Sequence, residues 1–283
     1  MDYDKNQSLK PYNKILLARM DKYTWDASDY EQSSSVQQMW ARELIAKLDL
    51  KGDERVLDIG CGDGKVTAEI ADDIKTGSIV GIDSSCEMIQ LAQNRYANSE
   101  RSNIRFVKHD ARNLPFNNEF DVVFSNAALH WIKDHLSVLR GIDRSLCSGG
   151  KMLLQMGGGK HNAADLVSVF EQLIEMDPWR EYYKDFTFPY NFYDPADYHP
   201  WLSKVGFAVK RVDLIPKDMI HDLPGFKSWV RTTWIPYTQR VPENERNKFL
   251  QQAIDEYLYR HPPDDDGMTH LGMLRLEVEA SKP

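Results

Sequence analysis

Residues 56–64 read VLDIGCGDG, and the residues after them, KVTAEI, have the apolar spacing of a helix. The pattern predicts a buried strand with an acidic residue near its end, then a tight glycine turn and a helix N-terminus. Glycines let a ligand come close to the backbone, where the N–H groups of the turn point outward. The spacing is G-x-G-x-G, whereas dinucleotide-binding folds carry G-x-G-x-x-G. The stretch therefore indicates a nucleotide-type site but argues against a dinucleotide.

A second acidic strand end supports such a site. Residues 78–83 read SIVGID, so a short predicted strand ends at Asp83, 23 residues after Gly60 (83 − 60). In a βαβ unit the second parallel strand ends beside the first, and a carboxylate at roughly 20 residues' distance commonly accepts hydrogen bonds from a ribose diol. The residues that follow predict a helix whose capping box pairs Ser84 with Glu87.

Three more strands are predicted before residue 157. Residues 103–111, NIRFVKHDA, end near Asp110, and residues 120–126, FDVVFSN, are followed by AALHW at 127–131. A fifth strand is predicted at residues 151–156, KMLLQM, after an apolar-periodic helix and the turn at 148–150. Acidic residues therefore stand at the ends of three successive strands.

Residues 55–126 resemble the nucleoside-binding half of class I S-adenosylmethionine-dependent methyltransferases, whose first strand and loop read hydrophobic-Asp-hydrophobic-Gly-x-Gly-x-Gly. The segment NAALHW at 126–131, with residues 23–30 and 34–37, also resembles the trans-aconitate and juvenile-hormone-acid methyltransferase group. This similarity covers most of residues 1–157 and is much weaker beyond. It implies an α/β, Rossmann-like fold: a seven-stranded, mostly parallel sheet with helices on both faces, an antiparallel last strand and a helical cap insertion.

The resemblance implies S-adenosyl-L-methionine as the cofactor. The glycine turn is expected to hold its methionine end, Asp83 its ribose hydroxyls and Asp110 its adenine amine. Tyr30 and Gln37 are expected either to close over the cofactor or simply to pack. The residues predicted around the cofactor are Tyr30, Gln37, Asp58, Gly60, Cys61, Gly62, Asp83, Ser84, Met88, Asp110, Ala111 and Asn126.

Composition and charge narrow the class of protein. The chain has 283 residues, and its 43 acidic against 35 basic side chains give a formal charge of −8, which disfavours non-specific nucleic-acid binding. The three cysteines show no metal or disulfide spacing. The N-terminus lacks the apolar core of a signal peptide, and no apolar run approaches the roughly 18 residues that span a membrane. We expect a cytoplasmic protein with no metal, membrane or nucleic-acid partner.

The chain is predicted to divide near residue 157. Residues 1–157 would hold N-terminal helices and the cofactor-binding core. Residues 158–283 would add the cap helices, mainly 158–200 and 215–268, to the last two strands, predicted at 207–214 and 271–280. The two parts are expected to form one compact domain with a cap.

One segment of the cap stands out by its charge. Residues 226–241 contain three cations, four aromatics and no acid. The spacing predicts one buried helix face, which Pro236 would end, formed by Phe226, Trp229, Val230 and Trp234. This is either an ordinary capping helix with surface arginines or an apolar wall with a cationic clamp for a carboxylate, which a guanidinium fork suits. In the second interpretation the substrate contacts are Arg231, Trp234 and Arg240.

His130 and Trp131 are the predicted catalytic residues, because they lie just beyond the fourth strand. A carboxylate acceptor is already ionised at neutral pH and needs no base, so His130 would orient it or pack. The leading hypothesis is therefore methyl-ester formation on a small-molecule acid. The alternatives are a C- or N-methyltransferase with His130 as its base, or a noncatalytic regulatory protein that binds S-adenosylmethionine. A dinucleotide-dependent oxidoreductase is disfavoured by the glycine spacing.

Overall fold

A seven-stranded sheet forms the centre of the computed structural model, which describes residues 35–96 and 101–283. The strand order is β3-β2-β1-β4-β5-β7-β6. The first five strands run parallel, while β7 is antiparallel to both neighbours, which confirms the predicted fold class. The strands are β1 Arg55–Ile59, β2 Ser78–Asp83, β3 Ile104–Lys108, β4 Phe120–Asn126, β5 Leu146–Gly157, β6 Ala208–His221 and β7 Thr269–Ser281.

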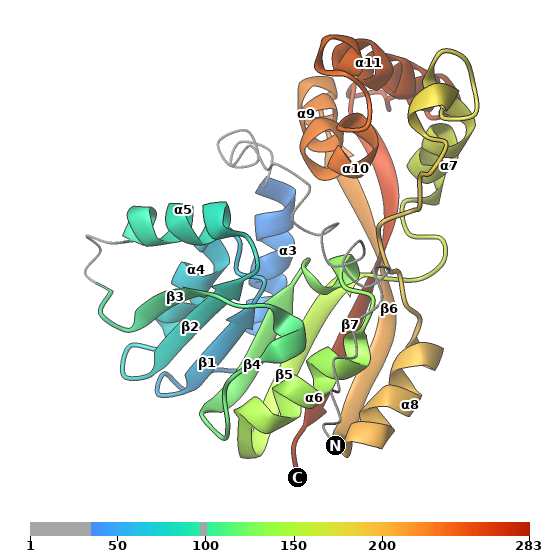
Figure 1. The fold of residues 1–283 in the computed structure, drawn as a ribbon. Coiled ribbons are helices and arrows are strands. Elements are labelled where there is room, and N and C mark those ends of the chain that lie inside the picture. The colour runs from blue at the N-terminus through green and yellow to red at the C-terminus, as the bar shows by residue number, and fades with distance from the viewer. Residues whose placement is uncertain (1–34, 97–100) are drawn as a thin grey trace, which may run out of the picture.

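Helices cover both faces of the sheet (Figure 1). One face carries α3 Ser35–Ala46, α4 Lys65–Asp73 and α5 Cys86–Tyr96, and the other carries α6 His135–Ser145 and α8 Pro195–Val205. Successive side chains of a strand point to opposite faces, so neighbouring residues of β1 lie in two different cores, one on each face of the sheet. Val56 lies in the core formed with Leu44 and Ile70, whereas Leu57 lies in the core formed with Leu139.

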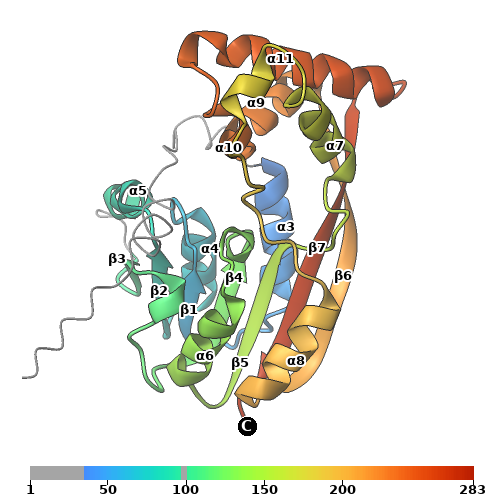
Figure 2. The same cartoon turned by 45° about the vertical axis from the view of Figure 1, so that its right-hand side comes forward.

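The last two strands extend beyond the rest of the sheet and carry the cap. β6 and β7 pair along their length, from Ala208 opposite Ser281 to His221 opposite Thr269. Around their far ends lie the cap helices (Figure 2). These are α7 Ala164–Leu173, α9 Leu223–Thr233, α10 Ile235–Thr238 and α11 Glu243–Arg260.

Three predicted boundaries are wrong. The sixth strand continues to His221, so residues 215–221 belong to the sheet, and the insertion begins at residue 222. Residues 195–200 belong to α8, which packs against β6 and α6 instead of lying in the cap. The fifth strand begins at Leu146, because its first residues continue the pairing with β4 across an irregularity in register.

The cap has its own aromatic core. The four residues predicted on one helix face are buried there, each at most 2 % exposed: Phe226, Trp229, Val230 and Trp234. Trp40 of α3 joins this core and so links the cap to the rest of the molecule. Pro236 does not end the helix as predicted, because α9 already ends at Thr233 and Pro236 lies in α10.

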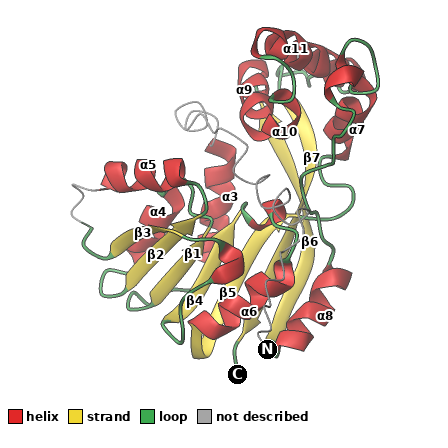
Figure 3. Ribbon diagram, in the orientation of Figure 1, coloured by secondary structure: helices red, strands yellow, loops and turns green. Residues whose placement is uncertain are grey.

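Short 3₁₀ segments connect the larger elements. They are η2 Ala111–Asn113, η3 Leu129–Trp131 and η4 Trp179–Tyr182. Figure 3 shows the outcome: the strands form one layer, and the helices lie on its two faces and around the far end of β6 and β7. Within the described ranges, none of the helices combines the length and the apolar character needed to cross a bilayer.

Candidate active site

The glycine turn joins β1 to the end of β2. Gly60 N and Cys61 N both donate to Ile82 O, at 2.7 and 2.9 Å. Gly60, Gly62 and Gly64 have φ angles of 78°, 53° and 82°, in the left-handed region that glycine adopts without strain. A Cβ at Gly60 would lie 2.1 Å from the Ala128 Cβ, whereas a Cβ at Gly62 would meet nothing within 4 Å. The turn is therefore closed against the segment after β4 and open at Gly62.

Asp83 lies beside the turn, as predicted. Its carboxylate accepts hydrogen bonds from Gly62 N at 3.1 Å and from Ser85 N at 2.8 Å. Burial raises the pKa of Asp83, and these backbone donors oppose that rise. An ionised carboxylate has about four lone-pair sites, so two backbone donors leave acceptor capacity for a ribose diol. Its binding role remains a prediction.

Two buried groups lie close to the turn. The Asp58 carboxylate is 2 % exposed and accepts a hydrogen bond from Thr67 Oγ1 at 2.6 Å. Burial raises its pKa to about 7. Burial also raises the pKa of the Cys61 thiol well above its ordinary value, so this cysteine is protonated and is not a nucleophile.

The predicted capping box at Ser84 is wrong by one residue. α5 begins at Cys86, and it is Ser85 Oγ that accepts from Met88 N at 3.2 Å. Ser85 also donates to Glu87 Oε2 at 2.8 Å. Ser85 is held in this position because its own N–H is bound by the Asp83 carboxylate. Ser84 is exposed and Met88 is buried at the first turn of α5.

The remaining predicted cofactor residues follow β3 and β4. Asp110 caps η2, accepting from Arg112 N and Arg112 Nε at 2.9 Å each, so an adenine amine would share a carboxylate that already pairs with a cation. Ala111 is buried beside it. Asn126 ends β4 opposite Gln155. Tyr30 lies outside the described residues, as does the side chain of Gln37.

His130 and Trp131 lie in η3, directly after β4. Gly157 N donates to His130 Nδ1 at 3.3 Å, and ring centroids of Trp131 and Tyr190 lie 5.9 and 5.7 Å from the imidazole. Burial, and then the charge of Arg275, lowers the pKa of His130 to about 3. The ring is therefore neutral at physiological pH. Because Nδ1 accepts, its single proton is on Nε2.

A second histidine holds this segment in place, and the sequence had not singled it out. His135 Nε2 lies 2.8 Å from Leu129 O, and its Nδ1 lies 2.5 Å from Tyr198 Oη. A neutral ring satisfies both contacts by donating from Nε2 and accepting at Nδ1. Burial lowers the pKa of His135 to about 4, consistent with that state. His135 thereby connects η3 to α8.

The predicted substrate contacts divide into two groups. Trp234 is 2 % exposed and meets Tyr190 edge to face at 5.5 Å, so it belongs to the aromatic cluster that includes His130. The two arginines instead contact cap residues. Arg231 is exposed and donates to Ser228 Oγ at 3.2 Å, and Arg240 donates to Tyr182 O at 3.2 Å. Their role toward substrate remains a prediction.

Another cation, Arg275 of β7, contributes to the lowered pKa of His130 through its charge, and the sequence had not singled it out. It is 5 % exposed and stands opposite Gly157, whose N–H binds the imidazole. The signal that could have found it is the alternation along β7. Leu271, Met273 and Arg275 occupy every second position and are all buried, which places a charged side chain in an inward-facing row.

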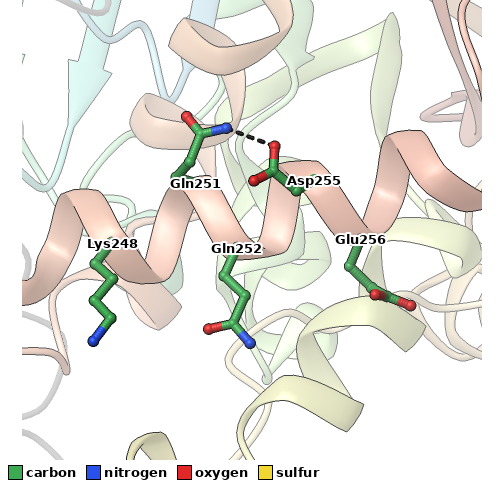
Figure 4. A pocket seen from close by; sticks show the side chains of 5 residues that line it. All are labelled: Lys248, Gln251, Gln252, Asp255 and Glu256. Atoms are coloured by element: carbon green, nitrogen blue, oxygen red, sulfur yellow. Dashed lines mark hydrogen bonds between the residues drawn. The ribbon is translucent and has the colours of Figure 1, made fainter.

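A cavity of about 440 Å³ lies elsewhere, on α11 of the cap (Figure 4). Its lining consists of polar side chains from that one helix: Lys248, Gln251, Gln252, Asp255 and Glu256. None of the predicted site residues lines it. We propose that the active site lies at the glycine turn and the segment after β4, where Asp83 contacts the turn and His130 contacts β5.

The family described as "Methyltransferase domain" matches residues 50–205, from just before β1 to the end of α8. An uncharacterized methyltransferase of Schizosaccharomyces pombe is 31% identical, over 91% of this chain and 98% of its own.

The chain is a class I S-adenosylmethionine-dependent methyltransferase.

Other relatives of this methyltransferase carry a more specific name. Trans-aconitate 2-methyltransferases of Agrobacterium fabrum and Escherichia coli are each 28% identical over 91% of this chain, covering 99% and 98% of their own length. Among solved structures, phosphoethanolamine N-methyltransferase 2 of Haemonchus contortus, in complex with S-adenosylhomocysteine, aligns with a TM-score of 0.61 at 20% identity. It covers 93% of this chain and 60% of its own, and at that identity it shows the fold alone. The cofactor of the present enzyme is S-adenosylmethionine.

Proposed function

We propose that this methyltransferase forms a methyl ester on a carboxylate of a small-molecule acid. The trans-aconitate 2-methyltransferases at 28% identity support this acceptor class by name. The hydrogen bond that His130 Nδ1 accepts from Gly157 N supports it by chemistry, and that is the observation that carries the proposal.

A neutral His130 suits an acceptor that needs no base. With its pKa lowered to about 3 and its Nδ1 occupied by Gly157 N–H, the imidazole has little capacity to take up a proton at neutral pH. Hydroxyl and amine acceptors lose a proton on methylation, and general-base catalysis requires a pKa near the working pH. A carboxylate is ionised already, and the Nε2–H of His130 can donate to it.

The surroundings of His130 suit the same reaction. Bound S-adenosylmethionine supplies an electrophilic methyl group on a positively charged sulfur. The protein must then hold the acceptor oxygen in line and exclude water, which stabilises separate charges better than the merged transition state. Tyr190 and Phe192 stack at 5.5 Å beside the imidazole, and Trp131 lies 4.6 Å from Tyr190. We propose that these aromatic side chains help to exclude water from the reacting groups.

Two features of the glycine turn support the proposal that the cofactor binds there. The space around Gly62 is open, and Asp83 stands beside it with acceptor capacity to spare. We propose that Gly60, Gly62 and Asp58 surround the methionine end and that Asp83 binds the ribose. Met88 of α5 and Ala111 of η2 would then adjoin the adenine.

The chemical nature of the product tests the proposal. The enzyme is incubated with S-adenosylmethionine labelled in its methyl group and with trans-aconitate, crotonate or phosphoethanolamine as acceptor. We expect the label to be in a methyl ester of the carboxylic acid, from which mild base releases it as methanol. The amount of labelled ester should equal the amount of S-adenosylhomocysteine formed. A base-stable product would instead identify an N- or C-methyltransferase. Cofactor binding without turnover on a broad panel of acids would favour a regulatory protein.

A further inference from the structure

Residues 183–194 connect the cap to the start of α8 (Figure 2). Two hydrogen bonds near the middle of this stretch reach different parts of the molecule. Tyr190 Oη donates at 2.7 Å to the backbone carbonyl of Thr233, the last residue of α9 in the cap. The next residue, Asn191, donates its backbone N–H at 2.7 Å to the carbonyl of His130. Adjacent residues therefore link the cap to the predicted catalytic histidine.

Tyr190 also packs against the imidazole of His130. The two ring centroids lie 5.7 Å apart. The Tyr190 ring lies 4.6 Å from that of Trp131, the other predicted catalytic residue, and stacks on Phe192 at 5.5 Å with an angle of 2° between the planes. Tyr190 is 7 % exposed, so these neighbours enclose it. The imidazole is thus held at Nδ1 by Gly157 N and at its side by the Tyr190 ring.

We propose that Tyr190 is a positioning residue for His130: its bond to Thr233 fixes its ring, and the fixed ring sets the direction of the imidazole Nε2–H. This inference rests on the proposed function, in which that N–H donates to the acceptor carboxylate. A site residue must be held within about 10–20° of its productive geometry. An imidazole bound only at Nδ1 can still tilt about that bond, and a packed neighbour prevents the tilt only if it is itself fixed. The cap thereby contributes to the geometry of the reacting groups.

The test removes the hydroxyl of Tyr190 and keeps its ring. Tyr190→Phe is compared with a matched control, Tyr183→Phe. Tyr183 is 6 % exposed, and its hydroxyl donates at 2.6 Å to the backbone carbonyl of Tyr237, also in the cap. Its ring packs on Phe186, Tyr237 and Phe249 of the cap. Each variant therefore loses a buried hydrogen bond of the same kind, and urea unfolding should show similar losses of stability.

Kinetics give the first readout, with trans-aconitate or crotonate as acceptor, whichever the unaltered enzyme methylates. We expect Tyr190→Phe to lower kcat about fivefold, because small misplacements of a positioned group slow the reaction. The KM for the acid and the affinity for S-adenosylhomocysteine should stay within about twofold, as should kcat in Tyr183→Phe. In a His130→Gln background, Tyr190→Phe should lower kcat no further, since residues that act through one another have non-additive effects.

Nitrogen NMR of the imidazole gives a second readout, which needs no substrate. The histidines are isotope-labelled, and the signals of His130 are identified by their absence in His130→Gln. Tyr190→Phe should shift both ring-nitrogen signals of His130. It should leave those of His135, which is bound by Leu129 O and Tyr198 Oη. Tyr183→Phe should shift neither pair, whereas a merely structural role of Tyr190 would make the two variants alike.

The outcomes that overturn the inference differ from those that overturn the proposed function. Unchanged imidazole signals in Tyr190→Phe refute the positioning role whatever the product of the reaction is. Equal losses of kcat in Tyr190→Phe and Tyr183→Phe would show a general loosening of the cap. A loss of the same size with and without His130 would show that Tyr190 acts independently of it. A base-stable product from the unaltered enzyme refutes the proposed function, even where the imidazole signals shift as expected.

Discussion

His130 and Asp58 show how burial sets the charge of the site residue by residue. Burial lowers the pKa of the imidazole to about 3 and raises that of the carboxyl to about 7, so each group is driven toward its neutral form. The sequence identified both positions through the motifs around them. It could not assign their protonation states, because those depend on how deeply other elements bury the two groups.

The raised pKa of Asp58 predicts that substituting this residue increases the free energy of unfolding by an amount that depends on pH. Because the folded-state pKa lies above the ordinary value of 3.8, the stability linked to its proton is present below about pH 4 and is lost as pH rises through 7. Asp58→Asn should therefore exceed the unaltered enzyme in unfolding free energy by roughly 2–4 kcal/mol near pH 8, with little difference near pH 4. Urea unfolding at the two pH values measures this. A constant difference across the range would contradict it.

The lowered pKa of His130 predicts that stability changes with pH in the opposite direction. Its folded-state pKa lies below the ordinary 6.5, so the unfolded chain takes up a proton first and stability falls as pH drops from about 6.5 toward 3. His130→Gln should flatten that part of the stability profile. Glutamine also offers an N–H near Nε2, so we expect a loss in kcat of less than about 100-fold, the lower end of a general base's contribution. A larger loss, together with a new pH dependence of kcat, would indicate a base.

At the scale of elements, local sequence signals predicted the turn between β1 and α4, but they did not predict features that depend on distant contacts. Strand, turn and helix were predictable because their apolar spacing and glycines are local signals, and so was the antiparallel last strand from the family resemblance. The length of β6 was not, since residues 215–221 acquire strand structure only by pairing with β7. The contacts of Arg231 and Arg240 depend on cap packing and were equally out of reach.

Two glycines of the turn provide a matched pair of substitutions. In Gly60→Ala the new methyl would lie 2.1 Å from the Ala128 Cβ, so the turn or the segment after β4 must shift. We expect a clear loss of thermal stability. In Gly62→Ala the methyl enters open space, so the protein should stay folded at a cost of about 1 kcal/mol for the left-handed conformation, yet lose affinity for S-adenosylhomocysteine. Melting curves and calorimetry separate the two effects. Unchanged affinity in Gly62→Ala would place the cofactor elsewhere.

The whole molecule consists of a sheet with two helical faces and a cap with a separate aromatic core. Phe170, Phe249 and Tyr237 lie in that core, whereas the glycine turn contacts β2 and the segment after β4. We propose, in line with the division predicted near residue 157, that cofactor binding belongs to the first part and substrate selection to the cap. Where the cap helices begin and end could not be predicted, because their packing depends on contacts far apart in the chain.

A substitution in the cap core tests that division. Phe170 is fully buried and stacks on Tyr237 at 4.5 Å, so Phe170→Leu should destabilise the cap by roughly 1–3 kcal/mol through poorer packing. We expect the KM for the acid substrate to rise while the affinity for S-adenosylhomocysteine stays within about twofold. A parallel loss of both would show that the cap and the cofactor site form one cooperative unit.

The central claim is that the cofactor lies on the glycine turn with its ribose held by Asp83, and calorimetric titration with S-adenosylhomocysteine tests it most directly. Asp83→Ala is compared with Asp72→Ala, which removes an exposed carboxylate paired with Arg101 at 2.7 Å. We predict one-to-one binding to the unaltered enzyme and to Asp72→Ala, and at least tenfold weaker binding, about 1.4 kcal/mol, to a folded Asp83→Ala. Equal affinity in all three proteins would contradict the account.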